Sequence, residues 1–467
     1  MTTKNQQSSD MQMPINVGRL HFVGIGGIGM SGIAEVLLNL GYTVSGSDLS
    51  ENANVLRLKK LGAKIYIGHN PENITGASAL IISTAIKKDN LEYAHAKKLR
   101  IPVVHRSEML AELMRLKQSI AIGGTHGKTT TTSLVAHALM KGDLEPTVIN
   151  GGIINSLGTN ARFGKGKWLV AEADESDGTF TRLPATIAVV TNIDTEHLDH
   201  YGNFDTIKKA FATFIQNIPF YGCAILCTDH KEVQKLSLQI EDRRIITYGL
   251  NPQANVRGEN LRSSTTGTTF DVFHNNALIK NVFIPLHGKH NIQNTLASIA
   301  VTIELGITDF KELYSDFGGV KRRFTNTGAF KGATVIDDYA HHPVEIKAVL
   351  QAARSTTNGK VIAIMQPHRY TRLQSLFEDF STCFNDADTV FITPVYTASE
   401  DPIDGISHIS LANNITQSGH QQAGSLDTYA DIVKAIENVA KPDDIIIFLG
   451  AGDITKWAND LPTKTSV

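Results

Sequence analysis

Two glycine-rich segments of the chain have the residue spacing of phosphate-binding loops. The stronger one is GGTHGKTT, in which Gly127, Lys128 and Thr129 stand between an apolar run and a segment of helical periodicity. In such a loop the backbone amides surround phosphate oxygens, the lysine meets the terminal phosphates and the hydroxyl binds Mg²⁺. The first glycine of the usual pattern is replaced by Ile122, so the loop is a variant. We predict that ATP or a related nucleotide is bound by Gly124, Thr125, His126, Gly127, Lys128, Thr129 and Thr130.

The second candidate loop is GIGGIG, where Gly24, Gly26 and Gly29 satisfy the pattern G-x-G-x-x-G after an apolar run. The glycines allow a tight turn and let backbone amides approach a pyrophosphate at the start of a helix. Asp48 ends the next apolar segment, where a carboxylate can accept a hydrogen bond from a ribose hydroxyl. These residues leave three interpretations open: a dinucleotide, another nucleotide diphosphate, or a glycine-rich helix start kept for close packing.

Acidic and histidine side chains follow two later apolar runs. The run WLVAEAD reaches Glu172, and further acids follow at Asp174, Glu175 and Asp177. Carboxylates at the carboxyl end of a strand lie beside the phosphate loop in parallel sheets, where they can complete a Mg²⁺ shell. We favour Glu172 as a ligand, whereas Asp174 and Asp177 fit solvated loop acids equally well. In TNIDTEHLDHYG we favour a functional role for His197, because it follows a buried run at the same edge.

The elements that would position these groups alternate along almost the whole chain. Apolar runs such as LHFVGIG, SIAIGG, IAVVTNID and DIIIFLGAG are separated by segments of helical periodicity. This alternation indicates an α/β protein with largely parallel sheets. After a tail at 1–14, we predict three blocks, at 15–117, 118–324 and 325–467. The turn-rich, alternating segment 250–285 predicts an antiparallel insertion in the second block.

Composition excludes several classes of protein. A chain of 467 residues with 42% hydrophobic and 19% charged residues is long enough for several globular domains. The formal net charge of -2, with no basic stripe, argues against nucleic-acid binding. No apolar run approaches the roughly 20 residues that cross a bilayer, and the tail lacks the apolar core of a signal peptide. Three cysteines are too few for a disulfide framework, and Cys223 and Cys227 fit core packing better than metal binding, so we expect a cytoplasmic protein.

Eight stretches, taken in order, give a more specific indication. They are GIGGIGMSGIAEVL, GTHGKTTTT, EADESDGTF, TNIDTEHLDHYG, HGKHNIQN, GVKRRF, DDYAHHPVEI and QPHRYTR. With them the chain resembles, from Gly24 to about Asp453, the ATP-dependent amide ligases that build the peptidoglycan peptide, and most of all their alanine-adding branch. The resemblance implies three consecutive domains: a Rossmann-like UDP-binding domain, a P-loop ATP-binding domain and a C-terminal Rossmann-like α/β domain. It also implies that the first loop binds UDP rather than NAD.

The reaction implied by this resemblance joins L-alanine to the lactyl carboxylate of UDP-N-acetylmuramate. ATP would phosphorylate the carboxylate, and the alanine amine would then displace phosphate from the acyl phosphate. The residues implied for the UDP-sugar are Gly24, Gly26, Gly27, Gly29, Asp48, Ser83, Thr84 and Arg106. Those implied for the nucleotide, besides the loop, are Asn291, Asn294 and Arg322. Those implied for Mg²⁺, or for Mn²⁺ in its place, are Thr129, Glu172 and His197.

The same resemblance assigns the amino acid to the third block. The implied catalytic residues are Lys128, His197, Asp338, His341, His342 and Arg369. The residues implied to contact alanine are Tyr339, His341 and Arg372. Asp338 or a histidine could deprotonate the alanine ammonium, while the arginines could bind a carboxylate or a phosphate. The alternative for Asp338 is that it only caps the helix that follows.

Three departures from the family pattern stand out. Related ligases carry a carbamylated lysine near the position of Phe211, so we predict no modified lysine here. The stretch STAI at 83–86 stands where two serines are usual. The stretch YTASEDPIDG at 396–405 differs from the usual Ala-Ala-Gly-Glu, which leaves the substrate contacts there open.

Three other functions compete with this one. A recycling ligase would attach a whole tripeptide to the same UDP-sugar, but GIGMSGIAEVL and Tyr339 favour the alanine-adding branch. An NAD-dependent oxidoreductase would leave Lys128 and Glu172 without a role, and an ATPase that uses ATP only as a switch would leave the first loop unexplained. The expected partners are therefore UDP-N-acetylmuramate, L-alanine and ATP, without nucleic acid or membrane. We expect a monomer or a weak homodimer.

Overall fold

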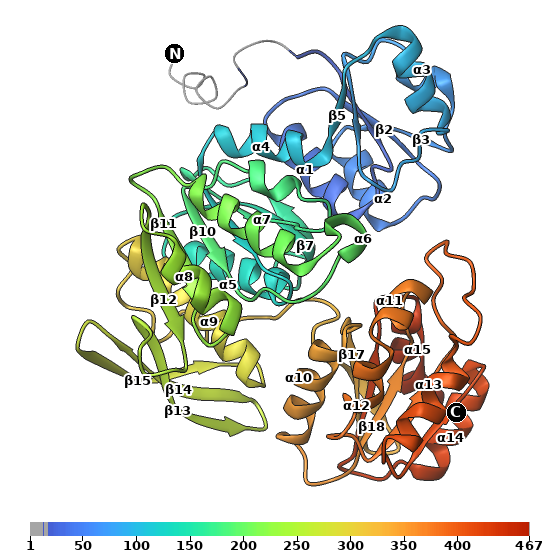
Figure 1. The fold of residues 1–467 in the computed structure, drawn as a ribbon. Helices are drawn as coiled ribbons and strands as arrows, with labels where there is room; N and C mark the ends of the chain where they lie inside the picture. Colours follow the sequence, from blue (N-terminus) through green and yellow to red (C-terminus); the bar gives the residue numbers. More distant parts are fainter. Residues whose placement is uncertain (1–12, 14–16, 467) are drawn as a thin grey trace. The chain divides into compact units, whose positions relative to one another are not determined.

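The structure is a computed structural model that describes residue 13 and residues 17–466. The predicted tail at 1–14 therefore lies, apart from Met13, outside the described residues. The chain divides into two compact units. The first comprises residues up to Asn260 together with 271–282 and 293–318, and the second comprises 261–270, 283–292 and 319–467. Three β-sheets, each accompanied by helices, follow one another along the sequence (Figure 1).

The first sheet is parallel and has the strand order β3-β2-β1-β4-β5. Its strands are β1 (Leu20–Val23), β2 (Val44–Asp48), β3 (Lys64–Ile67), β4 (Ala79–Ile82) and β5 (Val103–His105). Its helices are α1 (Ile28–Asn39), α2 (Ala53–Lys60), η1 (Pro71–Ile74), α3 (Leu91–Leu99) and α4 (Arg106–Arg115). The order of the strands reverses between β1 and β4, and ligands of such sheets bind at the carboxyl ends of the strands beside this reversal.

The second sheet has ten strands in the order β15-β14-β13-β12-β11-β10-β6-β9-β7-β8. They are β6 (Gln118–Gly123), β7 (Thr147–Ile154), β8 (Thr159–Arg162), β9 (Trp168–Glu172), β10 (Ile187–Val190), β11 (Cys223–Cys227), β12 (Arg244–Gly249), β13 (Val256–Ser264), β14 (Gly267–His274) and β15 (Ala277–Ile284). In this order, every neighbouring pair from β13 to β7 is parallel. The edge strand β8 is antiparallel to β7. The helices are α5 (Lys128–Lys141), η2 (Thr179–Arg182), α6 (Leu198–Tyr201), α7 (Phe204–Gln216), α8 (Lys231–Gln239) and α9 (Lys289–Glu304).

The strands β13, β14 and β15 form the insertion that the sequence predicted at 250–285. They are neighbours in the sheet, and two residues join each consecutive pair, a connection that makes β-hairpins. In the second turn both residues, Asn275 and Asn276, have positive φ angles of 48° and 63°. Asparagine tolerates this left-handed conformation better than most residues, which explains why the turn forms there.

The third sheet has the order β16-β17-β21-β18-β19-β20, and β16 is its antiparallel strand. Its strands are β16 (Thr325–Phe330), β17 (Ala333–Asp338), β18 (Val361–Met365), β19 (Thr389–Ile392), β20 (Ala423–Ser425) and β21 (Ile445–Leu449). Its helices are α10 (Pro343–Arg354), α11 (Tyr370–Ser375), α12 (Phe377–Thr382), α13 (His408–Gln417), α14 (Tyr429–Val439), α15 (Ile454–Asp460) and η3 (Leu461–Ser466). Two apolar clusters pack around it, one that includes Ile336, Ala363 and Leu449 and another that includes Val335, Ile364 and Phe448.

The first sheet and most of the second share one compact unit, in which α1 packs against β7 and the edge strand β8. Asn160 of β8 donates from Nδ2 to the carbonyl oxygen of Ile28 at 2.6 Å, and its Oδ1 accepts from Arg57 at 3.0 Å. Arg57 also donates to Glu35 at 2.9 Å. A Cβ on Gly32 of α1 would lie 2.9 Å from Asn160 Nδ2, so a larger residue at this position would have to displace the Asn160 amide.

The predicted fold class, three consecutive α/β domains, is confirmed by these three sheets. The predicted block boundaries at 117 and 324 stay predictions; the last of the boundaries between the two compact units falls at Gly318–Gly319. All three cysteines are buried and unpaired, in agreement with the preference for core packing at Cys223 and Cys227. Among the described residues, no helix combines the length and the apolar character needed to span a bilayer.

Candidate active site

The first glycine loop connects β1 to α1 at the carboxyl edge of the first sheet. Gly24 has a φ of 72°, a left-handed conformation that favours glycine. The helix begins after Gly27, which as a glycine has no side chain to cap it, and no acid stands in its first turn. Its first amides and its positive dipole end are therefore available to an anion.

Asp48, at the end of β2, closes the loop from one side. Its Oδ2 accepts a hydrogen bond from the Gly26 amide at 2.8 Å. A Cβ on Gly26 would lie 2.9 Å from this oxygen and 2.5 Å from Asn52 Nδ2, so a larger residue would displace both side chains. The structure thus brings the predicted residues of the loop and Asp48 together.

The remaining residues predicted for the UDP-sugar follow the two neighbouring strands. Ser83 and Thr84 lie in the turn after β4, and Ile86 of that turn would be 3.7 Å from a Cβ on Gly24. Arg106 is the first residue of α4, directly after β5. Its Nη1 lies 3.0 Å from the position of a Cβ on Gly29, so the guanidinium reaches the start of α1.

The second glycine loop connects β6 to α5. Gly127 has a φ of 83° at the N-cap of α5, and as a glycine it has no side chain to cap the helix. Lys128 donates from Nζ to the carbonyl oxygens of Gly124 at 2.6 Å and Thr125 at 3.1 Å, and it contacts Glu175 Oε2 at 2.8 Å. Burial opposes the charge of Lys128, but the carboxylates of Glu175, Glu172 and Asp174 together outweigh burial and raise its pKa. The lysine therefore stays cationic.

Glu175 is almost fully buried beside this lysine. Burial raises the pKa of its carboxyl to about 7, against the opposite effect of Lys128. The backbone oxygen of Glu175 accepts from the Tyr201 hydroxyl at 2.6 Å, which fixes the segment. The sequence analysis noted Glu175 only as one of several loop acids, and its direct contact with Lys128 is a finding of the structure.

Thr129 and Glu172, both predicted to bind metal, lie in contact. Thr129 Oγ1 donates to Glu172 Oε2 at 3.0 Å, and the Gly151 amide donates to the same oxygen at 2.9 Å. His197, the third predicted ligand, lies beside two other acids. Its Nε2 is 3.8 Å from Glu175 Oε1 and 3.9 Å from Glu196 Oε2.

The group Glu175, Glu196 and His197 is itself a candidate cation site. One ligand atom of each residue lies within 4.8 Å of the other two. His197 has a φ of 56°, and this left-handed backbone precedes the short helix α6. The sequence analysis missed Glu196, although it stands next to His197 in TNIDTEHLDHYG.

Two further neighbours shape the second loop. Asn192 accepts from the His126 amide through Oδ1 at 2.7 Å and donates from Nδ2 to the His126 carbonyl oxygen at 3.0 Å, so it holds the loop backbone on both sides. Phe211 is fully buried and packs on Phe180, with ring centroids 5.0 Å apart. The position aligned with the carbamylated lysine is therefore part of the apolar core here.

The asparagines predicted for the adenine end lie at the start of α9. Asn294 Oδ1 accepts from the Thr131 hydroxyl at 3.1 Å and would be 2.7 Å from a Cβ on Gly127, so this side chain adjoins the second loop. Asn291 donates to the carbonyl oxygen of His287 at 2.8 Å.

In the second unit, Asp338 is the last residue of β17. Its Oδ2 accepts from the Phe324 amide and its Oδ1 from the Ala340 amide, both at 2.7 Å. Burial raises the pKa of Asp338 to about 6, with Arg323 and the two amides acting in the opposite direction. Both carboxylate oxygens thus accept hydrogen bonds from backbone amides, a pattern typical of a residue that stabilises a turn.

The histidines and the tyrosine that follow Asp338 lie on the same edge. His342 is the N-cap of α10 and accepts from the Val344 amide at 3.3 Å. His341 Nδ1 is 2.9 Å from the Tyr339 carbonyl oxygen and 3.5 Å from Glu345 Oε2. These contacts orient the His341 ring.

Arg322 also belongs to the second unit. It donates from Nη2 to the carbonyl oxygens of Gly450 at 2.6 Å and Gly452 at 3.1 Å, in the loop after β21. Its guanidinium lies over the Tyr339 ring, 4.8 Å from the centroid. Arg322 therefore ties the Gly450–Gly452 loop to the residues after β17.

The segment after β18 contributes two predicted arginines and one residue that the sequence analysis missed. Arg369 has a φ of 72° and donates to Glu400, and Arg372 Nη1 is 3.3 Å from His368 Nδ1. His368 stacks on Tyr396 with ring centroids 5.3 Å apart. Burial first, and then His341 and Arg372, lower the pKa of His368 to about 4, so its ring is neutral at neutral pH.

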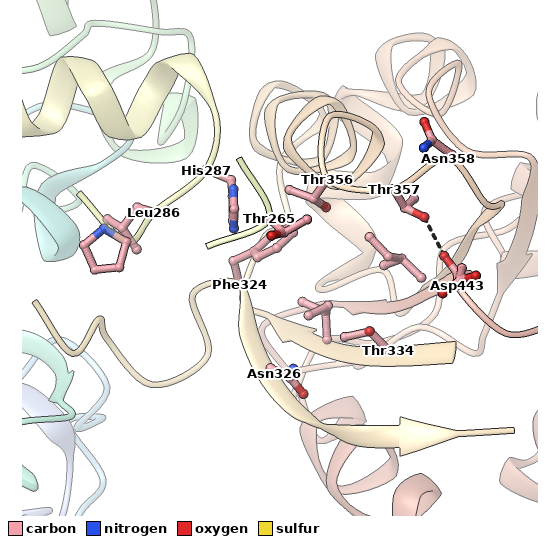
Figure 2. A pocket seen from close by; sticks show the side chains of 13 residues that line it. Thr265, Leu286, His287, Phe324, Asn326, Thr334, Thr356, Thr357, Asn358 and Asp443 are labelled. Carbon is pink, nitrogen blue, oxygen red and sulfur yellow. Dashed lines mark hydrogen bonds between the residues drawn. The ribbon is translucent and has the colours of Figure 1, made fainter. Parts of the chain in front are cut away.

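A cavity of about 600 Å³ lies elsewhere in the second unit (Figure 2). Thr334 and Ile445, at the start of β17 and β21, line it together with Thr357 and Asp443, which share a hydrogen bond. Chemistry in parallel sheets occurs at the carboxyl ends of the strands, and these residues stand at the amino ends. None of the predicted catalytic residues lines this cavity.

Comparison with known proteins assigns all three sheets to one family of enzymes. Three family models match the chain: "Mur ligase family, catalytic domain" at residues 19–118, "Mur ligase middle domain" at 122–302 and "Mur ligase, glutamate ligase domain" at 322–452. The chain is 57% identical to a UDP-N-acetylmuramate–L-alanine ligase of Brucella anthropi, over 97% of this chain and 98% of that protein. It is likewise 57% identical to one of Maricaulis maris, over 96% of this chain and 97% of that protein.

Two solved structures resemble the chain over nearly its whole length. The crystal structure of a UDP-N-acetylmuramate–alanine ligase from Thermotoga maritima has a TM-score of 0.80 and 30% identity, covering 96% of this chain and 99% of the other. A murein peptide ligase from Psychrobacter arcticus has a TM-score of 0.70 over 96% of this chain and 98% of the other. Its 22% identity makes it similar in fold alone.

Proposed function

The chain belongs to the Mur ligase family, and we infer that it joins L-alanine to the lactyl carboxylate of UDP-N-acetylmuramate with ATP, in peptidoglycan synthesis. The observation that carries this inference is the 57% identity to L-alanine ligases along 97% of the chain. The two glycine loops add a physical reason, because a UDP-sugar and ATP each need a phosphate site. The products are UDP-N-acetylmuramoyl-L-alanine, ADP and phosphate.

We propose that the second loop and its lysine drive the first half of the reaction. A carboxylate and an ammonium do not condense in water, so the lactyl carboxylate must first be activated. It attacks the γ-phosphate of ATP, which forms an acyl phosphate and releases ADP. Lys128 and the loop amides stabilise the charge on the transferring phosphoryl group, where positioning and electrostatics supply most of the catalysis. Asn291 and Asn294 hold the adenine end, and the predicted nucleotide role of Arg322 stays a proposal.

The residues around the second loop fit a divalent cation. Oxygen ligands are what Mg²⁺ prefers, and Thr129 and Glu172 offer them side by side. Glu175, Glu196 and His197 form a second group of the right size. We propose that Mg²⁺ is held by Thr129, Glu172 and His197, with Glu196 as an additional ligand. When bound, the cation neutralises charge on the phosphate oxygens.

We propose that the residues after β17 and β18 receive alanine. Arg369 and Arg372 carry the charge that its carboxylate needs, and Tyr339 and His341 lie on the same edge of the third sheet. His341 is the better candidate for removing the ammonium proton, because both oxygens of Asp338 accept backbone hydrogen bonds. His342, as the N-cap of α10, positions this turn.

The three blocks then divide the work. We propose that 15–117 binds the UDP-sugar, 118–324 binds ATP and 325–467 binds the amino acid. Both nucleotides are metabolites of the cytoplasm, so we expect the protein to act there. A monomer or a weak homodimer remains our expectation for its assembly.

The first experiment compares three amine conditions. Phosphate release is measured with ATP, Mg²⁺ and UDP-N-acetylmuramate in the presence of L-alanine, of the tripeptide L-Ala-γ-D-Glu-meso-diaminopimelate, or of no amine. Release that depends on L-alanine, with a product heavier by one alanine residue, supports the proposal. A clear preference for the tripeptide would instead identify a recycling ligase, and release without any UDP-sugar would refute a ligase.

A further inference from the structure

One acidic segment, residues 172–177 at the end of β9, contacts the second glycine loop and two residues that lie beside the first. On the side of the second loop, Glu172 binds Thr129 and Glu175 binds Lys128. On the side of the first loop, two consecutive residues at the start of α4 meet the other acids of the segment. Those pairs are Arg106 with Asp174 and His105 with Asp177. The segment therefore belongs to the second sheet but faces the binding edge of the first.

The Arg106 guanidinium is held between this segment and the first loop. Its Nη2 donates to Asp174 Oδ2 at 3.0 Å. Its Nη1 lies 3.0 Å from the position of a Cβ on Gly29, at the start of α1. Because the guanidinium is planar and its donors point in different directions, one nitrogen can stay on the carboxylate while another faces a phosphate.

Asp174 is fixed in turn by its own backbone. Its Oδ1 accepts from the Ser176 amide at 3.1 Å, which leaves Oδ2 for the arginine. A free arginine samples many rotamers, and fixing it when a ligand arrives costs conformational entropy. A carboxylate that orders the guanidinium beforehand removes much of this cost, which is the effect of preorganisation on affinity.

We propose that Asp174 is a positioning residue for the UDP-sugar: it holds Arg106 over the first glycine loop so that the guanidinium meets the diphosphate. This inference rests on the proposed function, which assigns the diphosphate to that loop. Asp174, which follows a strand of the second sheet, would then contribute to binding of the UDP-sugar by the first. Asp174 is then distinct from Glu172 and Glu175, whose contacts are with the second loop.

The competing interpretation places Asp174 with the metal and ATP. Lys128 does act on this carboxylate through its charge, but its ammonium pairs directly with Glu175, whereas Arg106 lies at hydrogen-bond distance from Asp174. Burial acts to raise the pKa of Asp174, and Arg106 before Lys128 lowers it to a net value below its usual range. The geometry therefore favours Arg106 as its partner.

The test measures UDP-N-acetylmuramate binding directly, by calorimetry without ATP, in four variants of the full chain. They are Asp174→Asn, Arg106→Gln, the double variant, and Asp177→Asn as a matched control from the same segment. Asp174→Asn should weaken binding about tenfold, the effect of losing one charge-assisted hydrogen bond. The double variant should bind as Arg106→Gln does, because the carboxylate acts only through the arginine. Asp177→Asn should bind within about twofold of the wild type, since Asp177 pairs with His105 and not with the arginine.

Kinetics separate this role from a merely structural one. In Asp174→Asn, KM for the UDP-sugar should rise while kcat and KM for ATP stay within about twofold of wild type, which also shows that the variant is folded. Unchanged UDP-sugar binding, a raised KM for ATP, or effects that multiply in the double variant would overturn the inference. Failure of the wild type itself to bind UDP-N-acetylmuramate would overturn the proposed function, and the inference with it.

Discussion

Replacing Lys128 by methionine should make the stability of the second sheet fall with pH above neutrality. Glu175 is 2% exposed, and Lys128 is the main group that opposes the effect of burial on its carboxyl. Its pKa is raised from 4.5 to about 7 even with the lysine present. Without Lys128 the pKa of Glu175 must rise further, because the unpaired carboxylate is disfavoured in a buried place.

The sign and size follow from proton linkage. A group whose pKa is raised on folding contributes stability at low pH that is lost as the pH rises through the folded value. In the wild type this loss is half complete on the pH scale near pH 7 and ends about one unit above it, so stability should fall by less than about 0.5 kcal/mol between pH 7 and 9. In Lys128→Met the loss continues at about 1.4 kcal/mol per pH unit, or up to about 2.7 kcal/mol between pH 7 and 9.

The measurement is denaturant unfolding followed by tryptophan fluorescence at pH 6, 7, 8 and 9. The chain has two tryptophans, and Trp168 opens β9, the strand that ends at Glu172. A background carrying Trp457→Phe leaves Trp168 as the only reporter. The matched control is the double variant Lys128→Met with Glu175→Gln, which has no buried carboxyl at this position and should show no extra slope.

Two results would refute the reasoning. A free-energy difference between Lys128→Met and wild type that stays constant from pH 7 to 9 would mean that Glu175 is not the titrating group. An equal slope in the double variant would assign the titration to another residue.

In turnover assays Lys128→Met should lose at least about a thousandfold in phosphate release, because the charge on the transferring phosphoryl group is no longer stabilised. Its affinity for the UDP-sugar should stay within about twofold.

Three further outcomes are expected. Gly26→Val should abolish UDP-sugar binding in calorimetry while ATP binding persists, because the new side chain would displace Asp48 from the loop; retained UDP-sugar affinity would contradict the assignment of this loop. Glu196→Gln should raise the Mg²⁺ concentration for half-maximal activity about tenfold, and an unchanged Mg²⁺ titration would remove Glu196 from the metal site. Asp338→Asn should lower stability by about 1–3 kcal/mol in unfolding assays, since an amide cannot accept both backbone hydrogen bonds of Asp338 through oxygen; full stability with lost turnover would instead support a catalytic Asp338.

The two glycine loops could be predicted from the sequence because their requirements are local. A strand, a turn with left-handed glycines and a helix without a cap follow one another within about a dozen residues. Glu172 was predicted for the same reason, since a carboxylate that ends a strand next to the loop strand must lie near Thr129. The family membership predicted from eight short stretches is confirmed by the comparisons with known proteins.

The contacts that the sequence did not reveal depend on long-range packing or on side-chain direction. Arg106 and Asp174 are 68 residues apart and meet only because two sheets share one unit. Glu196 adjoins His197 in sequence, but only the left-handed backbone at His197 shows that both side chains reach Glu175. His368 lacked a sequence signal because its stacking on Tyr396 depends on the loop after β19.

The acidic segment 172–177 also bears on how such enzymes can be recombined. A chimaera that takes residues 19–118 from one relative and the remainder from another would keep both glycine loops complete. It would nevertheless place His105 and Arg106 of one parent against the carboxylates of the other, so the first substrate would be held by a mismatched pair. Exchanging the segment together with the first block would restore the pairs with His105 and Arg106. It would, however, disturb the contacts of the segment with Thr129 and Lys128. The boundary between these two blocks is therefore a poor crossover point for recombination.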